Sequence, residues 1–142
     1  MPLENYRNIY IFAEDISGAQ QVLAFIKRTP NQRLFFSLKG LGKKYIEDAL
    51  GSVTSFKKSE IGRLNPAEDC ILIGTGANPS HYIGSLLQAK KQGIYTAAIL
   101  EHYCNYAERF ENTHEAFPEL ILTTDMFAYN VAQQVYTDSE IK

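Results

Sequence analysis

The chain has 142 residues, of which 45% are hydrophobic and 21% are charged, and its formal net charge is −2. A chain of this size and composition can bury a core, so we expect one folded domain over residues 1–142 and exclude a disordered protein. The slightly negative charge and the isolated lysine pairs argue against nucleic-acid binding. No apolar run reaches the roughly 20 residues of a membrane span, and nothing resembles a signal peptide. Neither Cys70 nor Cys104 belongs to a CxxC pair, so we expect a reduced, cytoplasmic protein in which Cys70 is a small buried hydrophobe.

Apolar runs alternate with amphipathic segments along the chain. Runs without period-two alternation predict strands covered on both faces, and they occupy residues 9–13, 34–38, 70–73, 95–100 and 120–123, with a brief edge strand at 53–56. Apolar residues at helical spacing predict the intervening helices. Ser17 can cap the first helix, with Gln20 at the position that closes a capping box, and the second helix ends at Gly51. The third begins at Asn78-Pro79, and the last covers about 126–136.

Strands separated by helices imply right-handed βαβ units and a mainly parallel sheet. We therefore predict an α/β fold, a three-layer Rossmann-like domain with about six strands in the order 3-2-1-4-5-6. Such sheets bind ligands in a crevice at the carboxyl ends of their strands. Residues that directly follow the predicted strands are therefore the candidates for a functional site.

Glu14, Asp15, Ser17 and Gly18 follow the first predicted strand. Paired acids at this point can hold a metal ion, as in response-regulator receiver domains. A receiver domain also needs an aspartate at the end of a middle strand, where this chain has Gly74. We therefore expect Asp15 or Ser17 to cap the next helix. Glu14, Ser17 and Gly18 remain candidates for ligand contact, because Ser17-Gly18 lets a substrate approach backbone N–H groups closely.

A glycine-rich loop containing Gly74, Gly76 and Asn78 joins the strand at 70–73 to the next helix. Glycines allow a ligand to approach the backbone, and the amides at a helix N-terminus favour an anion. The third glycine of a dinucleotide fingerprint is Pro79 here, which excludes that motif. The loop is either a tight turn or a contact with a polar or anionic ligand.

Ionisable and aromatic residues crowd the segment after the strand at 95–100. A metal site there is weakly supported, because His102 and Cys104 are not accompanied by a second spaced pair. A Cys–His nucleophile is no better supported, since side chains two positions apart diverge. His102 is the candidate catalytic residue, as an acid, base or hydrogen-bonding group, and Arg109 is a candidate clamp for an anion. Glu101 and Asn105 are further ligand candidates, and Asp125, after the last strand, most simply caps the final helix.

The same segment resembles a known family. In it, an apolar strand is followed by Glu101-His102, Asn105-Tyr106 and Arg109-Phe110, and then by residues 118–125 leading into a helix. This pattern resembles the amino-terminal domain of GT-B-type glycosyltransferases and related nucleotide-sugar enzymes of bacterial surface-polysaccharide synthesis. The resemblance is concentrated in residues 94–132, with looser support from the Gly74 loop. In that family this domain chiefly binds the acceptor, and the nucleotide-sugar binds mainly to a second domain across a cleft.

The resemblance implies a cleft-facing location for Glu14, Gly76, His102, Asn105, Arg109 and Asp125. It implies no cofactor, and it leaves open whether this domain pairs with a donor-binding chain, is a piece of a longer enzyme, or binds without transfer. The leading hypothesis is a domain that binds an acceptor or a sugar phosphate in polysaccharide synthesis and needs a donor-binding partner. The alternative is a non-catalytic small-molecule-binding module or a homodimeric interaction module.

Overall fold

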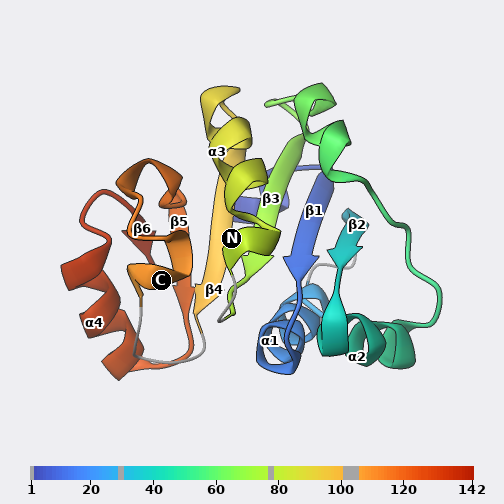
Figure 1. Ribbon diagram of the computed structural model, residues 1–142, viewed down its shortest axis with the longest axis horizontal. Helices are drawn as coiled ribbons and strands as arrows, with labels where there is room; N and C mark the ends of the chain where they lie inside the picture. The colour runs from blue at the N-terminus through green and yellow to red at the C-terminus, as the bar shows by residue number, and fades with distance from the viewer. Residues whose placement is uncertain (1, 29–30, 77–78, 101–105) are drawn as a thin grey trace.

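The computed structural model describes residues 2–28, 31–76, 79–100 and 106–142. Its strands form one parallel sheet in the order β2-β1-β3-β4-β5-β6 (Figure 1). The strands are β1 (Asn8–Ala13), β2 (Arg33–Leu38), β3 (Asp69–Gly74), β4 (Tyr95–Leu100), β5 (Leu120–Thr123) and β6 (Glu140–Ile141). The α/β class, the Rossmann-like layers and the predicted order of the long strands are confirmed.

The two edges of the sheet differ from the prediction in detail. The segment 53–56 lies beside β2 as expected, but it forms only an isolated bridge between Ser55 and Phe36. The opposite edge carries β6, which was not predicted. Its two residues pair with Leu120 and Ile121, a ladder too short to leave an apolar run in the sequence.

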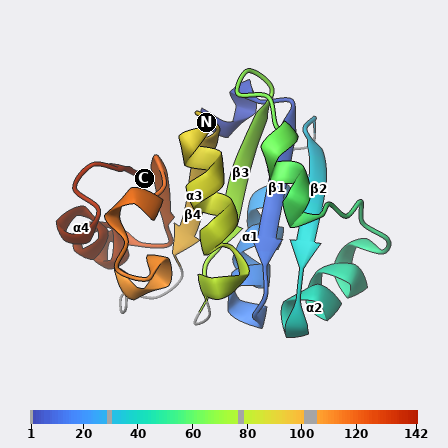
Figure 2. The same ribbon diagram turned by 45° about the horizontal axis from the view of Figure 1, so that its top comes forward.

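Helices cover both faces of the sheet. Helices α1 (Ile16–Ile26) and α2 (Gly40–Leu50) pack on one face, and α3 (Ile83–Lys91) and α4 (Met126–Val135) pack on the other. Figure 2 shows α3 in front of the sheet and α1 behind it. Successive side chains of β3 alternate between the faces, because Cys70 and Leu72 belong to the α1 side and Ile71 and Ile73 to the α3 side. Within the described ranges, no helix combines the length and apolar character needed to cross a bilayer.

Short 3-10 helices lie at the start of the chain and in several of the segments that connect the strands and α-helices. They are η1 (Pro2–Asn5), η2 (Lys58–Arg63), η3 (Pro79–His81), η4 (Glu108–Phe110) and η5 (His114–Ala116). The third helix was predicted to begin at Asn78-Pro79; Pro79 instead begins η3, and the α-helix starts at Ile83. Cys70 is fully buried, and this burial raises the pKa of its thiol to about 12, as expected for a structural cysteine.

Aspartates cap the first and last α-helices. The Gly18 amide donates to Asp15 Oδ1 at 2.8 Å, and the Ala128 amide donates to Asp125 Oδ1 at 2.8 Å. Of the two predicted caps of the first helix, Asp15 is confirmed. The alternative, Ser17 with Gln20, is wrong because α1 begins directly after Asp15 and Ser17 lies inside its first turn. The predicted cap by Asp125 is confirmed.

Candidate functional site

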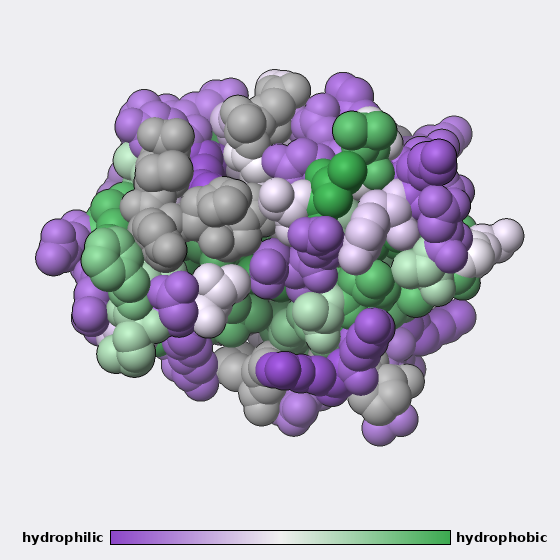
Figure 3. All heavy atoms as spheres, turned by 90° about the horizontal axis from the view of Figure 1, so that it is seen from below, coloured by the Kyte–Doolittle hydropathy of each residue, from purple (hydrophilic) through white to green (hydrophobic). Residues whose placement is uncertain are grey.

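The order in which strands are added to the sheet reverses at β1. The chain leaves β1 towards β2 on one side and later returns to β3 on the other side. The following loops diverge there, because α1 packs on one face and α3 on the other. In open α/β sheets, ligands bind outside the carboxyl ends of the strands at such a switch point. Figure 3 looks onto this end of the molecule, towards which the arrowheads of Figure 1 point.

A cavity of about 410 Å³ opens at the switch point. This volume lies within the range of roughly 300–1,000 Å³ that is usual for small-molecule sites. Its walls come from the loops after β1, β2 and β3, and the described lining residues are Glu14, Asp15, Ile16, Ser17, Gly40, Leu41, Gly74, Gly76, His81 and Tyr82. The cavity is therefore built by segments that are far apart in the sequence and meet only in the folded sheet.

Two polar atoms of the lining residues are buried without a hydrogen-bond partner among the described residues. They are Oε2 of Glu14 and Nδ1 of His81. The other ring nitrogen of His81, Nε2, lies 3.0 Å from the carbonyl oxygen of Ser37. A carbonyl only accepts, so Nε2 carries a proton, and in the neutral imidazole Nδ1 is then an acceptor. Both unpaired atoms are therefore hydrogen-bond acceptors, and both are closed off from solvent in this structure.

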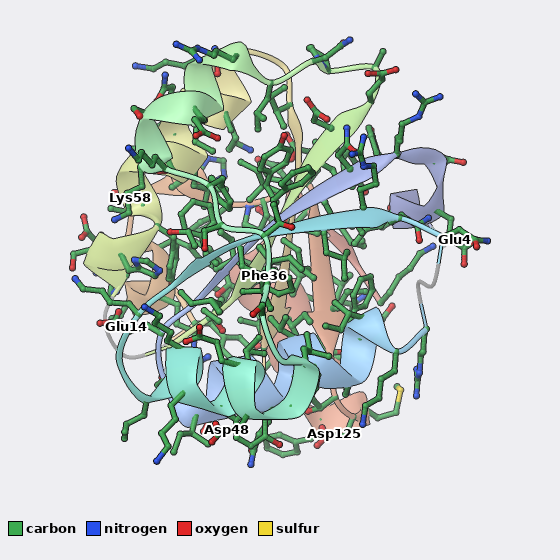
Figure 4. All side chains as sticks on the ribbon, turned by 90° about the vertical axis from the view of Figure 1, so that its right-hand side faces the viewer. Glu4, Glu14, Phe36, Asp48, Lys58 and Asp125 are labelled. Carbon is green, nitrogen blue, oxygen red and sulfur yellow. The ribbon has the colours of Figure 1, made fainter. Side chains whose placement is uncertain are left out.

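The surroundings of His81 favour its neutral form. Burial is the largest cause and lowers the pKa of the imidazole below its usual 6.5. The positive charges of Lys58 and Lys39 lower this pKa further, whereas the Ser37 carbonyl and Glu14 oppose the shift. In Figure 4, Glu14 and Lys58 lie on the same side of the molecule. The net result is an uncharged acceptor beside a carboxylate at neutral pH.

Glycines allow the loops around the cavity to touch. A Cβ placed on Gly74 would lie 2.7 Å from the carbonyl oxygen of Gly18 and 2.8 Å from Cγ2 of Val22. A Cβ on Gly42 would lie 2.6 Å from the carbonyl oxygen of Glu14, and one on Gly76 would collide with the carboxylate of Asp15. These glycines have a packing role, because only hydrogen fits between the segments.

Several of the residues predicted from the sequence meet in this cavity. Glu14, Ser17, Gly74 and Gly76 line it, and Gly18 lies in the first turn of α1, where its amide is bonded to Asp15. The sequence analysis missed the lining residues Ile16, Gly40, Leu41, His81 and Tyr82. The signal for His81 and Tyr82 was their position just beyond the glycine-rich loop that follows a predicted strand.

Arg109 and Asp125 lie outside the lining of this cavity. Arg109 is only 7% exposed, and its Nη1 donates to Thr75 Oγ1 at 2.7 Å, behind the loop that follows β3. Asp125 is exposed at the start of α4 and is well separated from Glu14 in Figure 4. The predicted site residues Asn78, Glu101, His102 and Asn105 lie outside the described residues.

A second hollow, also of about 410 Å³, lies between α1 and the ends of β4 and β5. Gln21, Phe25, Arg28, Ile99 and Leu122 are among its lining residues. None of the unpartnered buried polar atoms found among the described residues belongs to its walls. The switch-point cavity is therefore the stronger candidate site.

Comparisons with known protein families, with curated proteins and with solved structures found no match to this chain.

Proposed function

We propose that this protein binds a hydroxyl-bearing small molecule, with an uncharged sugar as the best-matched class, in the switch-point cavity. The observation that carries the proposal is that Glu14 and Asp15 line this cavity while its described lining residues include no lysine or arginine. A carboxylate accepts hydrogen bonds from hydroxyl groups and repels a phosphate. Of the two ligand classes expected from the sequence, the sugar is therefore favoured over the sugar phosphate.

Apolar groups complete the match to a sugar ring. Ile16 and Leu41 are 41% and 66% exposed at the cavity, and Tyr82 contributes an aromatic wall. A pyranose has C–H faces that pack on such surfaces while its hydroxyls seek polar partners. Small-molecule sites commonly combine a mainly apolar lining with a few convergent polar groups.

The sugar-binding proposal agrees with the acceptor-binding role implied by the family resemblance. In this proposal the chain supplies the acceptor side of a GT-B-type glycosyltransferase, and a donor-binding domain faces the carboxyl ends of the strands. Met126 and Phe127, at the start of α4, are 68% and 63% exposed at the same end of the sheet. Figure 3 shows apolar side chains gathered in separate areas of this face.

The same exposed residues support a second candidate, a homodimeric interaction module without transfer activity. Light scattering combined with a sugar titration separates the two candidates. A tight dimer that responds to no sugar favours the interaction module, whereas a monomer or dimer that binds a sugar favours the first proposal.

The ligand class is tested by NMR titration with paired probes. Methyl glycosides of glucose, galactose, mannose and N-acetylglucosamine are compared with the corresponding sugar 1-phosphates. We expect at least one uncharged glycoside to shift the amide signals of Glu14, Leu41 and Gly76, and to bind more tightly than its phosphate counterpart. Preferential binding of the phosphates, or shifts confined to the hollow beside Arg28, would contradict the proposal.

A further inference from the structure

We infer that the sugar bound in the switch-point cavity carries a compact apolar aglycone, the group joined to its anomeric carbon, and that this group packs against Ile16 and Leu41. This inference rests on the proposed function, because it names the class of sugar derivative that the same cavity takes. It assigns the selection of the aglycone to one side chain of α1 and one of α2.

The lining of the cavity changes from buried to exposed side chains. His81 and Tyr82 are only 4% and 3% exposed, whereas Ile16 and Leu41 belong to the exposed large hydrophobic residues of the chain. The first pair therefore forms part of the inner wall, and the second pair lies at the mouth. A sugar seated against the inner wall projects its substituent past the mouth.

Backbone contact holds together the two segments that carry the apolar pair. The Gly42 amide donates to the carbonyl oxygen of Glu14 at 2.7 Å. A Cβ on Gly42 would lie 2.6 Å from that oxygen and 2.8 Å from the carbonyl oxygen of Asp15, so the segments touch without an intervening side chain. Leu41 directly precedes Gly42, and Ile16 directly follows Asp15. The two apolar side chains therefore start from backbone segments that are fixed against each other.

Packing of the core does not account for the position of Leu41. Helix α2 buries only Gly42 and Ile46, and Leu41 is left largely in solvent. A single exposed leucine needs no explanation, but here two exposed apolar residues lie at the mouth of one cavity. The other exposed large hydrophobic residues in the described ranges lie outside its lining, namely Leu50, Met126 and Phe127.

The small size of the apolar pair favours a small group over a protein partner. A stable protein interface buries roughly 800 Å² on each side, and two side chains supply only a small part of that area. The neighbours of Leu41 are Gly40 and Gly42, which do not extend the apolar surface. The cavity of about 410 Å³ is of a size that accepts drug-sized ligands, which are larger than one monosaccharide. A sugar with one apolar substituent matches both features.

Two substitutions make the mouth of the cavity polar. Leu41→Gln keeps the length of the side chain, and Ile16→Thr keeps its branching. Leu50→Gln is the matched control, because Leu50 also lies in α2, is 42% exposed and does not line the cavity. The melting temperatures of all three variants should stay close to that of wild type, as is usual for exposed positions. A change in affinity is then not a loss of folding.

The test measures affinities for glycosides of the four sugars named above, each with a methyl, propyl, 2-hydroxyethyl or phenyl aglycone. The propyl and 2-hydroxyethyl groups are equal in size and differ in polarity. In wild type we expect the phenyl glycoside to bind about 5- to 50-fold more tightly than the methyl glycoside, through burial of apolar area. The propyl glycoside should likewise bind more tightly than the 2-hydroxyethyl glycoside.

The variants show where the aglycone lies. Leu41→Gln and Ile16→Thr should each lower the preference for phenyl over methyl about 3- to 10-fold, and they should leave the affinity for the methyl glycoside nearly unchanged. Leu50→Gln should keep the preference of wild type. A mutation that acts only on folding would weaken both glycosides alike and leave their ratio unchanged.

Three results would overturn the inference and leave the proposed function standing. The first is equal affinity of wild type for the phenyl and methyl glycosides. The second is a phenyl preference that both variants retain, since the aglycone would then lie elsewhere. The third is a dimer, seen by light scattering, that Leu41→Gln or Ile16→Thr converts to a monomer, because a second copy would then cover the mouth. If no glycoside binds wild type, the proposed function fails, and the inference fails with it.

Discussion

Gly74→Ala tests whether the glycines of the site act through packing. The added methyl group would lie 2.7 Å from the Gly18 carbonyl oxygen and 2.8 Å from Val22 Cγ2, closer than the 3.0 Å that real Cβ atoms essentially never cross. The nearest atom is backbone in the first turn of α1, so relief requires α1 to move away from β3. Overpacking of this kind costs about 1–3 kcal/mol. For a chain of this length, a loss of about 2 kcal/mol lowers the melting temperature by roughly 4–8 °C.

Gly84→Ala is the matched control for this substitution. Gly84 lies in α3, and its added Cβ would have nothing within 4 Å. Alanine at an open helical position stabilises by about 0.5–1 kcal/mol relative to glycine. Urea unfolding of the two variants should therefore move the midpoint in opposite directions. A Gly74→Ala variant that is as stable as wild type but has lost ligand binding would refute the packing argument and return Gly74 to direct ligand contact.

The remaining predictions concern the caps, the buried arginine and the pH dependence of stability. Asp125→Ala should lower the free energy of unfolding by about 1 kcal/mol through loss of the α4 cap and leave glycoside affinity unchanged, and reduced affinity in a folded variant would show that Asp125 contacts ligand. Arg109→Met should lower the free energy of unfolding by about 1.5–3 kcal/mol, because the charged donor to Thr75 is lost; an unchanged urea midpoint would contradict this. The pKa of His81 is lower in the folded protein than in the unfolded chain, so the unfolded chain binds a proton first as the pH falls below about 6.5. Stability should fall there, and His81→Gln should show a shallower loss than wild type between about pH 6.5 and 5; equal slopes would contradict a lowered pKa.

The central strands were predictable because each is covered on both faces. Side chains 70–73 alternate between two cores, so every position is apolar and the run stands out from the sequence. The edges were harder to predict because their pairing with the sheet is very short. Ser55 contributes a single bridge, and β6 needs only Glu140 and Ile141 to pair with β5, so neither edge requires a long apolar run.

The location of the candidate cavity was easier to predict than its lining. Glu14 and Gly76 were named because they follow predicted strands, and both line the cavity. Leu41 lies in α2 and His81 in η3, so their convergence at the cavity depends on how these two helices pack against the sheet. No local sequence pattern determines how α2 and η3 pack against the sheet. The choice between Asp15 and Ser17 as the cap of α1 stayed open in the sequence for a similar reason, since it depends on where the chain turns after β1.

Arg109 links the segment that first suggested a site to the cavity that the fold forms. Its guanidinium donates to Thr75, whose hydroxyl in turn donates to the Ile99 carbonyl at 2.8 Å, and the backbone carbonyl of Arg109 accepts from the Tyr82 hydroxyl at 2.6 Å. Thr75 lies in the loop after β3, and Tyr82 lines the cavity. The buried arginine thus ties the ends of β3 and β4 to the start of α3 from behind. An arginine fixed in this way supports the segments that form the cavity walls. Among the described lining residues, Glu14 has a buried carboxylate oxygen without a hydrogen-bond partner.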